Sequence, residues 1–204
     1  MIPMPPKIDM SELPVLYKDL TNNKEPGAAL REHGILHLIG EISHETCTPI
    51  IKQIIEFNLL PPDRAPETIY MYVNSEGGDV NVAFHLIDIM KQSRIPILTS
   101  SMGLVCSAAL MIVMAGHKGA RYATQNTIFM SHQFSSGYYG KEHELFSMVK
   151  SYELYSLKIL EHYKKCTGKN EKFIRKELLP ETDIWFSSED AVKYGIIDQI
   201  ITTY

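Results

Sequence analysis

The amino-acid sequence predicts an α/β protein with a largely parallel sheet. From residue 34 onward, short β-branched or aromatic runs alternate with segments that repeat apolar residues at helical spacing, which is typical of parallel strands joined by helices. The chain has 204 residues, enough for one domain with a substantial core. Hydrophobic residues make up 45% and charged residues 22%, which are ordinary globular values and exclude a mainly disordered chain.

The first 33 residues differ in composition from the rest. They hold five of the eleven prolines, so we expect residues 1–33 to form an N-terminal arm that either frays or docks on a partner. Residues 34–204 are expected to form the single domain. Within it, strands are predicted at 34–39 and 68–74, with a helix inside 45–57 and a proline-rich loop at 61–67 between them.

The predicted elements continue after a turn at Gly77 and Gly78. A helix follows, with one apolar face made by Val80, Ala83, Phe84, Ile87 and Met90. A buried strand is predicted at 95–100, ended by Gly103, then a buried helix at 107–115 and a strand at 127–131. A short helix to residue 179, a helix ended by Gly195 and a strand at 196–201 complete the chain.

One predicted helix is unusually long. Residues 142–164 contain no Gly or Pro and repeat apolar residues at helical spacing, which gives a helix of about 35 Å. The pattern alone leaves open whether this helix lies in the core or projects to contact another subunit.

Charge and cysteine usage exclude several classes of protein. Twenty basic and twenty-four acidic residues give a net charge of −4, with no basic footprint for nucleic acid or an anionic membrane. No apolar stretch approaches the roughly 20 residues of a membrane span. Three cysteines are too few for a disulfide framework or a zinc cluster, and no metal motif occurs, so we expect no metal and a reducing, cytoplasmic location.

Ser107 is the first residue that could carry chemistry. It follows a predicted strand, opens an apolar helix and has small neighbours, so an attacking hydroxyl there would lie beside unpaired backbone amides. A small helix-capping serine is the plainer alternative. Cys106 beside it is a minor alternative nucleophile.

His132 is the second residue that could carry chemistry, because it ends a strand near a sheet edge where α/β sites gather. A purely structural histidine is the alternative. His33, His143 and His162 lie in charged contexts and are expected to be solvated. The Gly77-Gly78 pair is either an ordinary turn or a place where backbone amides approach a ligand closely.

Five sequence words, in this order, resemble the proteolytic subunits of the Clp protease family over residues 34–203. They are YMYVNSEGG at 70–78, VCSAAL at 105–110, AGHKGAR at 115–121, SHQ at 131–133 and DAVKYGIID at 190–198. The resemblance implies the Clp protease/crotonase-type fold of repeated β-β-α units with a long projecting helix. It also implies an ATP-dependent-type serine endopeptidase subunit that cleaves unfolded polypeptides inside an oligomeric chamber.

The resemblance further implies a site. It gives a catalytic triad of Ser107, His132 and Asp183, the last of which composition alone does not single out. The backbone amides of Gly78 and Ala108 would form the oxyanion hole. The substrate strand would contact Gln133, Phe134 and Ser135.

The family also implies partners. These are other copies of the chain in a heptameric ring, stacked in pairs through helix 142–164, and a hexameric Clp-type ATPase that binds a pocket at Tyr70 and Tyr72. Ordinary strand packing is the alternative for the two tyrosines. ATP would be used by that partner, with no cofactor in this chain, and the location would be cytoplasmic or the equivalent soluble organellar or host compartment.

The sequence departs from the family at several positions. Ala108-Ala109 stand where Met-Gly usually follows the serine, Phe134 replaces a proline, and Thr182 replaces an arginine that pairs across rings. Residues 1–33, the arm or axial segment, do not match the family's axial hairpin. Two other functions stay open: a non-catalytic ring subunit, and a crotonase-type acyl-coenzyme A enzyme, which shares the fold and the paired-amide oxyanion hole.

Overall fold

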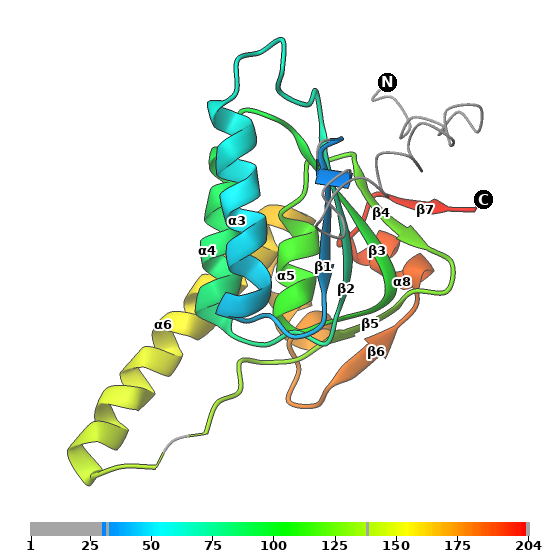
Figure 1. The fold of residues 1–204 in the computed structure, drawn as a ribbon. Coiled ribbons are helices and arrows are strands. Elements are labelled where there is room, and N and C mark those ends of the chain that lie inside the picture. The colour runs from blue at the N-terminus through cyan, green and yellow to red at the C-terminus, as the bar shows by residue number, and fades with distance from the viewer. Residues whose placement is uncertain (1–29, 32, 138, 203–204) are drawn as a thin grey trace.

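Strands and helices alternate through the described part of the chain, as the sequence predicts. The computed structural model describes residues 30–31, 33–137 and 139–202, so the predicted arm at 1–33 lies almost wholly outside the described residues. The elements, labelled as in Figure 1, are β1 (Ile35–Ile39), α3 (His44–Leu59), β2 (Ile69–Ser75), α4 (Val80–Gln92), β3 (Ile97–Cys106), α5 (Ala108–Met114), β4 (Arg121–Thr124), β5 (Ile128–Ser131), α6 (Glu142–Thr167), α7 (Glu171–Phe173), a π-helical turn (Ile174–Leu178), β6 (Ile184–Phe186), α8 (Ser188–Tyr194) and β7 (Gln199–Ile201).

The seven strands form one sheet, which branches at β3. The parallel path runs β1-β2-β3-β4-β7, while β5 pairs with the end of β3 and β6 pairs antiparallel with β5. The prediction that Gly103 ends this strand was wrong. Gly103 lies inside β3 with φ 73°, between residues 99–101, which pair with β4, and residues 104–106, which pair with β5. Its positive φ, which glycine adopts at little cost, accompanies the change of partner.

Three helices, α3, α4 and α5, cover one face of the sheet (Figure 1). Ser43 caps α3 and Asp79 caps α4, each with a side chain that accepts a backbone N–H of the first turn. Every residue of α5 is buried, as expected for an apolar helix between sheet and neighbouring helices. Large aliphatic side chains such as Leu38, Ile54 and Leu86 are buried, and each contributes about 1.5–3 kcal/mol to folding.

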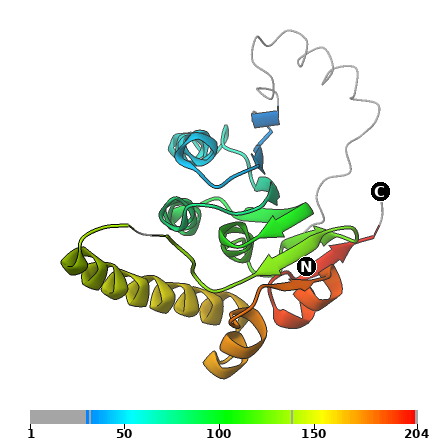
Figure 2. The ribbon, with the colours of Figure 1, turned by 90° about the horizontal axis from the view of Figure 1, so that it is seen from below.

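Helix α6 projects from the body of the molecule, as Figures 1 and 2 show. Its buried residues, Ile159, Leu160, His162 and Tyr163, all belong to its C-terminal part. Closer to its N-terminus five large apolar side chains are exposed, so the core-helix alternative holds only for the last turns. They are Leu145, Phe146, Val149, Leu154 and Leu157. In the described part of the chain, no helix combines the length and the apolar character required to span a membrane.

Three short strands differ from the predicted elements. Strands β4 and β6, of four and three residues, were not predicted, and β7 begins at Gln199 rather than at residue 196. Strands as short as β4 and β6 carry too little periodicity to be recognised. The start of β7 was set too early because Ile196 and Ile197 are apolar and buried, although they lie in the loop before the strand.

His162 was expected to be solvated, and that prediction was wrong. Its side chain is buried on α6, where Nε2 donates to the Met111 carbonyl at 2.8 Å and Phe84 packs edge-on against the ring. Burial lowers the pKa of His162 to about 4, although the bond to Met111 acts in the opposite direction. The folded protein therefore holds this imidazole neutral.

This buried imidazole predicts a loss of stability in mild acid. Between pH 6.5 and about 4 the unfolded chain protonates His162 while the folded chain does not, so the free energy of unfolding falls as the pH falls. The loss is about 3 kcal/mol over that window. Denaturant unfolding at pH 7 and pH 4 should show that His162→Gln loses less stability than the wild type. Equal losses in both proteins would contradict this account.

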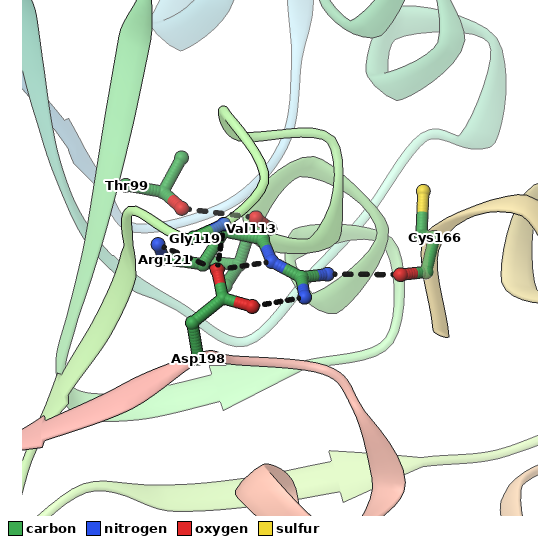
Figure 3. Close-up of polar contacts among 6 residues, drawn as sticks. All are labelled: Thr99, Val113, Gly119, Arg121, Cys166 and Asp198. Atoms are coloured by element: carbon green, nitrogen blue, oxygen red, sulfur yellow. Dashed lines mark hydrogen bonds and ion pairs between the residues drawn. The ribbon is translucent and has the colours of Figure 1, made fainter. Parts of the chain in front are cut away.

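An ion pair between a buried arginine and a half-buried aspartate ties the sheet to the end of α6 (Figure 3). Arg121, 3% exposed, forms two hydrogen bonds to Asp198 through Nη2 and Nε, at 2.6 and 2.9 Å. Its Nη1 donates to the Cys166 carbonyl at 3.1 Å, and the Gly119 and Arg121 amides donate to Asp198 Oδ2. Burial acts to raise the pKa of Asp198, but the hydrogen bonds and charge of Arg121 outweigh it and lower that pKa. The network joins β4, the start of β7 and α6.

Candidate active site

Ser107 occupies a strained turn between β3 and α5. Its φ of 53° and ψ of −122° make it the only non-glycine with positive φ among the described residues. Such strain in a strand-to-helix turn exposes a nucleophilic serine at the top of a sheet in other hydrolases. Ser107 occupies the N-cap position of α5, but its side chain makes no capping hydrogen bond, so a capping role does not account for its hydroxyl.

Gly77 fixes this turn from the side of β2. A Cβ on Gly77 would lie 2.8 Å from the Cys106 carbonyl oxygen and 2.8 Å from the Ser107 Cβ, and its φ is +96°. Only glycine therefore lets the backbone after β2 approach the serine so closely. The ordinary-turn interpretation of Gly77-Gly78 is insufficient, because this turn packs against the nucleophile.

The sheet brings His132 to Ser107. Strand β5 pairs parallel with β3 so that Met130 lies opposite Cys106, and the Ser107 amide donates to the Met130 carbonyl at 3.0 Å. His132 is the first residue after β5, and its Nε2 lies 2.8 Å from Ser107 Oγ. The structure thus joins the first two predicted catalytic residues in one hydrogen bond.

The register of β5 and β6 relates Asp183 to this pair. It immediately precedes β6, and Ile184 at the start of β6 pairs with Ser131. The pairing ends at these two residues. Continued by one residue, the same register would set Asp183 opposite His132, and directly opposed side chains have Cβ atoms about 4.5–5.5 Å apart. Asp183 is exposed, and within the described residues no hydrogen bond joins its carboxylate to His132.

The two predicted oxyanion-hole residues lie in the same cleft as Ser107. Gly78 is held by a parallel bridge to Ile42, which donates to the Gly77 carbonyl at 2.7 Å and accepts from Asp79 at 2.8 Å. Ala108 is the first residue of α5, so its amide has no partner within the helix. Neither the Gly78 nor the Ala108 amide donates a hydrogen bond in the part of the chain that the structure describes.

The cleft has a volume of about 260 Å³. Its residues come from four segments of the chain: Glu76, Gly78, Val80, Ser107, Ala108, Met111, Met130, His132, Gln133, Phe134, Ser135, Ile159 and Tyr163. The three predicted substrate-strand residues, Gln133, Phe134 and Ser135, are among them. Sequence reasoning did not place the buried residues Ile159 and Tyr163 in the site, although they recur at helical spacing and so share a face of α6.

Aromatic contacts hold Phe134 against α6. Its ring stacks on Tyr155 at 4.8 Å between centroids and meets Tyr152 edge-on at 5.4 Å. The Tyr152 hydroxyl donates to the Ser136 carbonyl, and the Tyr155 hydroxyl donates to Asn81 Oδ1 at 3.0 Å. The segment after β5 is therefore attached to the base of the projecting helix.

Cys106 is unsuited to the role of nucleophile. The residue is 2% exposed, and burial, together with the negative charge of Glu76, raises the pKa of its thiol to about 11. The reactive form of a cysteine is the thiolate, so a buried neutral thiol is inert. No group of three or more His, Cys, Asp and Glu side chains in the described ranges is arranged to hold a metal ion.

Tyr70 and Tyr72 lie outside this cleft. Both belong to β2 and alternate with the buried Ile69, Met71 and Val73, so their side chains lie on the sheet face opposite the helices. They line a hollow of about 30 Å³ with Leu98, Tyr122, Ile201 and three neighbouring residues. Both the ordinary-packing interpretation and the partner-pocket interpretation are compatible with this position.

The sequence matches one family model and similarly named proteins from several bacteria. The Clp protease family model matches residues 21–204. The chain is 33% identical over 163 residues to "ATP-dependent Clp protease proteolytic subunit 2" of Treponema denticola, covering 80% of this chain and 79% of that protein. It is 30% identical to "ATP-dependent Clp protease proteolytic subunit 1" of Corynebacterium jeikeium, covering 85% and 89%. It is 31% identical to "ATP-dependent Clp protease proteolytic subunit" of Deinococcus radiodurans, covering 78% and 76%.

Proposed function

Because this chain belongs to the Clp protease family and is a serine endopeptidase subunit of the Clp type, we propose that Ser107, His132 and Asp183 carry its peptide cleavage. The observation that carries the proposal is the 2.8 Å contact from His132 Nε2 to the hydroxyl of Ser107, a serine held at positive φ in a cleft. A helix-capping role for Ser107 and a structural role for His132 do not explain why these two side chains share a hydrogen bond.

Acylation follows from this geometry. Ser107 Oγ attacks the scissile carbonyl carbon while its proton passes to His132 Nε2. The resulting oxyanion is stabilised by the Gly78 and Ala108 amides, each worth about 2.7–4 kcal/mol. His132 then gives the proton to the leaving amine, and the C–N bond breaks to leave an ester on Ser107. Asp183 accepts a hydrogen bond from His132 Nδ1, once its side chain turns toward the ring, and stabilises the imidazolium.

Deacylation repeats these steps with water in place of serine. His132 takes a proton from water, whose oxygen attacks the ester carbonyl, and returns the proton to Ser107 Oγ as the product carboxylic acid leaves. The peptide lies extended along Gln133, Phe134 and Ser135, whose exposed backbone adds it as a further strand. Recognition through the backbone suits unfolded polypeptides of varied sequence.

The assembly is a heptameric ring that stacks in pairs and encloses the clefts. The projecting part of α6 supports this proposal because it exposes apolar side chains that a monomer leaves in water, namely Leu145, Phe146, Val149, Leu154 and Leu157. The three free cysteines support a reducing compartment, the cytoplasm or its organellar or host equivalent. A hexameric Clp-type ATPase would bind at Tyr70 and Tyr72 and consume the ATP, with no cofactor in this chain.

The function is tested by peptide cleavage together with native mass measurement. We expect the wild-type assembly to cleave a fluorogenic peptide, and Ser107→Ala to assemble with the same mass and leave the peptide intact. Equal cleavage by both proteins would overturn the proposal. An assembled wild type without activity would favour the non-catalytic ring subunit, and stoichiometric coenzyme A binding would favour the crotonase-type alternative.

A further prediction concerns Phe134, where the family has proline. Phe134→Ala removes both ring contacts to α6, and each aromatic pair is worth about 0.5–1.5 kcal/mol. The substrate segment loses its attachment, so we expect KM for an unfolded-protein substrate to rise about five-fold. Steady-state kinetics of Phe134→Ala and of Phe134→Tyr, which keeps the ring, check this. An unchanged KM in Phe134→Ala would show that the ring does not position substrate.

A further inference from the structure

Glu76 is an acidic side chain in the cleft of Ser107 that the proposed mechanism does not use. It follows β2 and directly precedes Gly77, which packs against the nucleophile turn. Its side chain is exposed, and it lines the cleft together with Ser107 and His132. Among the cleft residues it is the only carboxylate, and no lysine or arginine lies among them.

The charge of Glu76 is not neutralised in the described structure. The next acid along the chain, Asp79, is occupied in capping α4, where its Oδ1 accepts the Asn81 and Val82 amides at 2.7 and 3.2 Å. Across the residues that the structure describes, Glu76 forms no ion pair and no side-chain hydrogen bond. Its field reaches the nucleophile turn, since it adds to burial in raising the pKa of Cys106.

An unpaired carboxylate in this position opposes the chemistry. A tetrahedral intermediate places a negative charge between the Gly78 and Ala108 amides, and a second negative charge in the same cleft raises its energy. A cation bound to Glu76 removes that cost. The remaining cleft residues include Val80, Met111 and Met130, apolar side chains that suit the methylene stem of a long basic side chain.

We propose that Glu76 binds a lysine or arginine side chain of the substrate near the scissile bond, and so gives this protease a preference for basic residues at one substrate position. The inference rests on the proposed function, because it needs the peptide to lie in this cleft. Glu76 acts here as a specificity-determining residue.

The test uses the full assembled chain and a set of quenched fluorescent peptides of one parent sequence. A single position is varied as Lys, Met or Glu and moved stepwise across the scissile bond. At one position we expect kcat/KM for the Lys peptide to exceed that for the Met peptide by about two- to five-fold, the range that an exposed ion pair supports. The ratio should shrink in about 1 M salt, where the Debye length is roughly 3 Å.

Variants assign the preference to Glu76. In Glu76→Gln the Lys-to-Met ratio should approach one, and in Glu76→Lys the Glu peptide should become the better substrate at the same position. Glu67→Gln, which removes an exposed acid outside the cleft, should keep the wild-type ratio. A wild-type ratio retained in Glu76→Gln, or no position at which Lys is preferred, would overturn the inference. Ser107→Ala separates the two proposals, because cleavage that persists there overturns the proposed function instead.

Discussion

Replacing Asp183 by Asn is expected to lower kcat for peptide cleavage about 10⁴-fold, and replacing Ser107 by Ala about 10⁶-fold, as in other triad proteases. Asn at 183 keeps the shape but cannot hold the His132 ring in the tautomer that leaves Nε2 free to accept the serine proton. The measurement is single-turnover and steady-state cleavage of one fluorogenic peptide, with assembly checked by native mass.

Asp183→Asn is the more demanding test, because no hydrogen bond between Asp183 and His132 is present in the described residues to support the role of Asp183. Their relation depends on the register of β5 and β6. Glu181→Gln is the matched control, since it removes a neighbouring exposed carboxylate two residues earlier and should change kcat less than two-fold. If Asp183→Asn behaved like Glu181→Gln, the aspartate of the triad would have to be sought elsewhere.

The largest expected effect on stability comes from the Arg121–Asp198 pair. Asp198→Ala leaves the guanidinium of Arg121 buried without its counter-charge, and breaking a buried pair in this way costs about 3–5 kcal/mol. The two amides that donate to Asp198 Oδ2 also lose their acceptor. Denaturant unfolding at pH 7 measures the difference.

Two controls make this stability prediction specific. Arg175→Gln breaks the exposed ion pair with Glu171 and should cost no more than about 1 kcal/mol. The double variant Arg121→Met, Asp198→Leu removes both buried charges together and should cost less than Asp198→Ala alone. A loss below 1 kcal/mol in Asp198→Ala would mean that the pair does not join β4, β7 and α6 as the structure indicates.

Much of the fold follows from local patterns in the sequence. Helices with a long apolar stripe, such as α4 and α6, were predicted nearly to their ends, because periodicity is strong over ten or more residues. Ser107 was recognisable because it follows a predicted strand and opens an apolar helix with small neighbours, and His132 because it lies at a strand end, where α/β proteins gather their sites. What joins them is the pairing of β3 with β5, which the sequence pattern does not contain.

Other features depend on tertiary contacts that no local pattern carries. The charged sequence around His162 suggested solvent, yet the ring faces Met111 and Phe84 from other elements. Strand β6 is three residues long, too short for periodicity to reveal it, so Asp183 could be assigned to the site only from the family resemblance. No local pattern singled out Glu76, which the fold brings into the cleft that Ser107 also lines.

Covalent labelling with a fluorophosphonate tests the central claim most directly, because such reagents phosphonylate an activated serine. We predict one adduct per chain, located by peptide mapping on Ser107, forming much more slowly in His132→Ala and absent in Ser107→Ala. Labelling on another residue, or an unlabelled Ser107 in a correctly assembled wild type, would contradict the assignment of Ser107 and His132 as nucleophile and base.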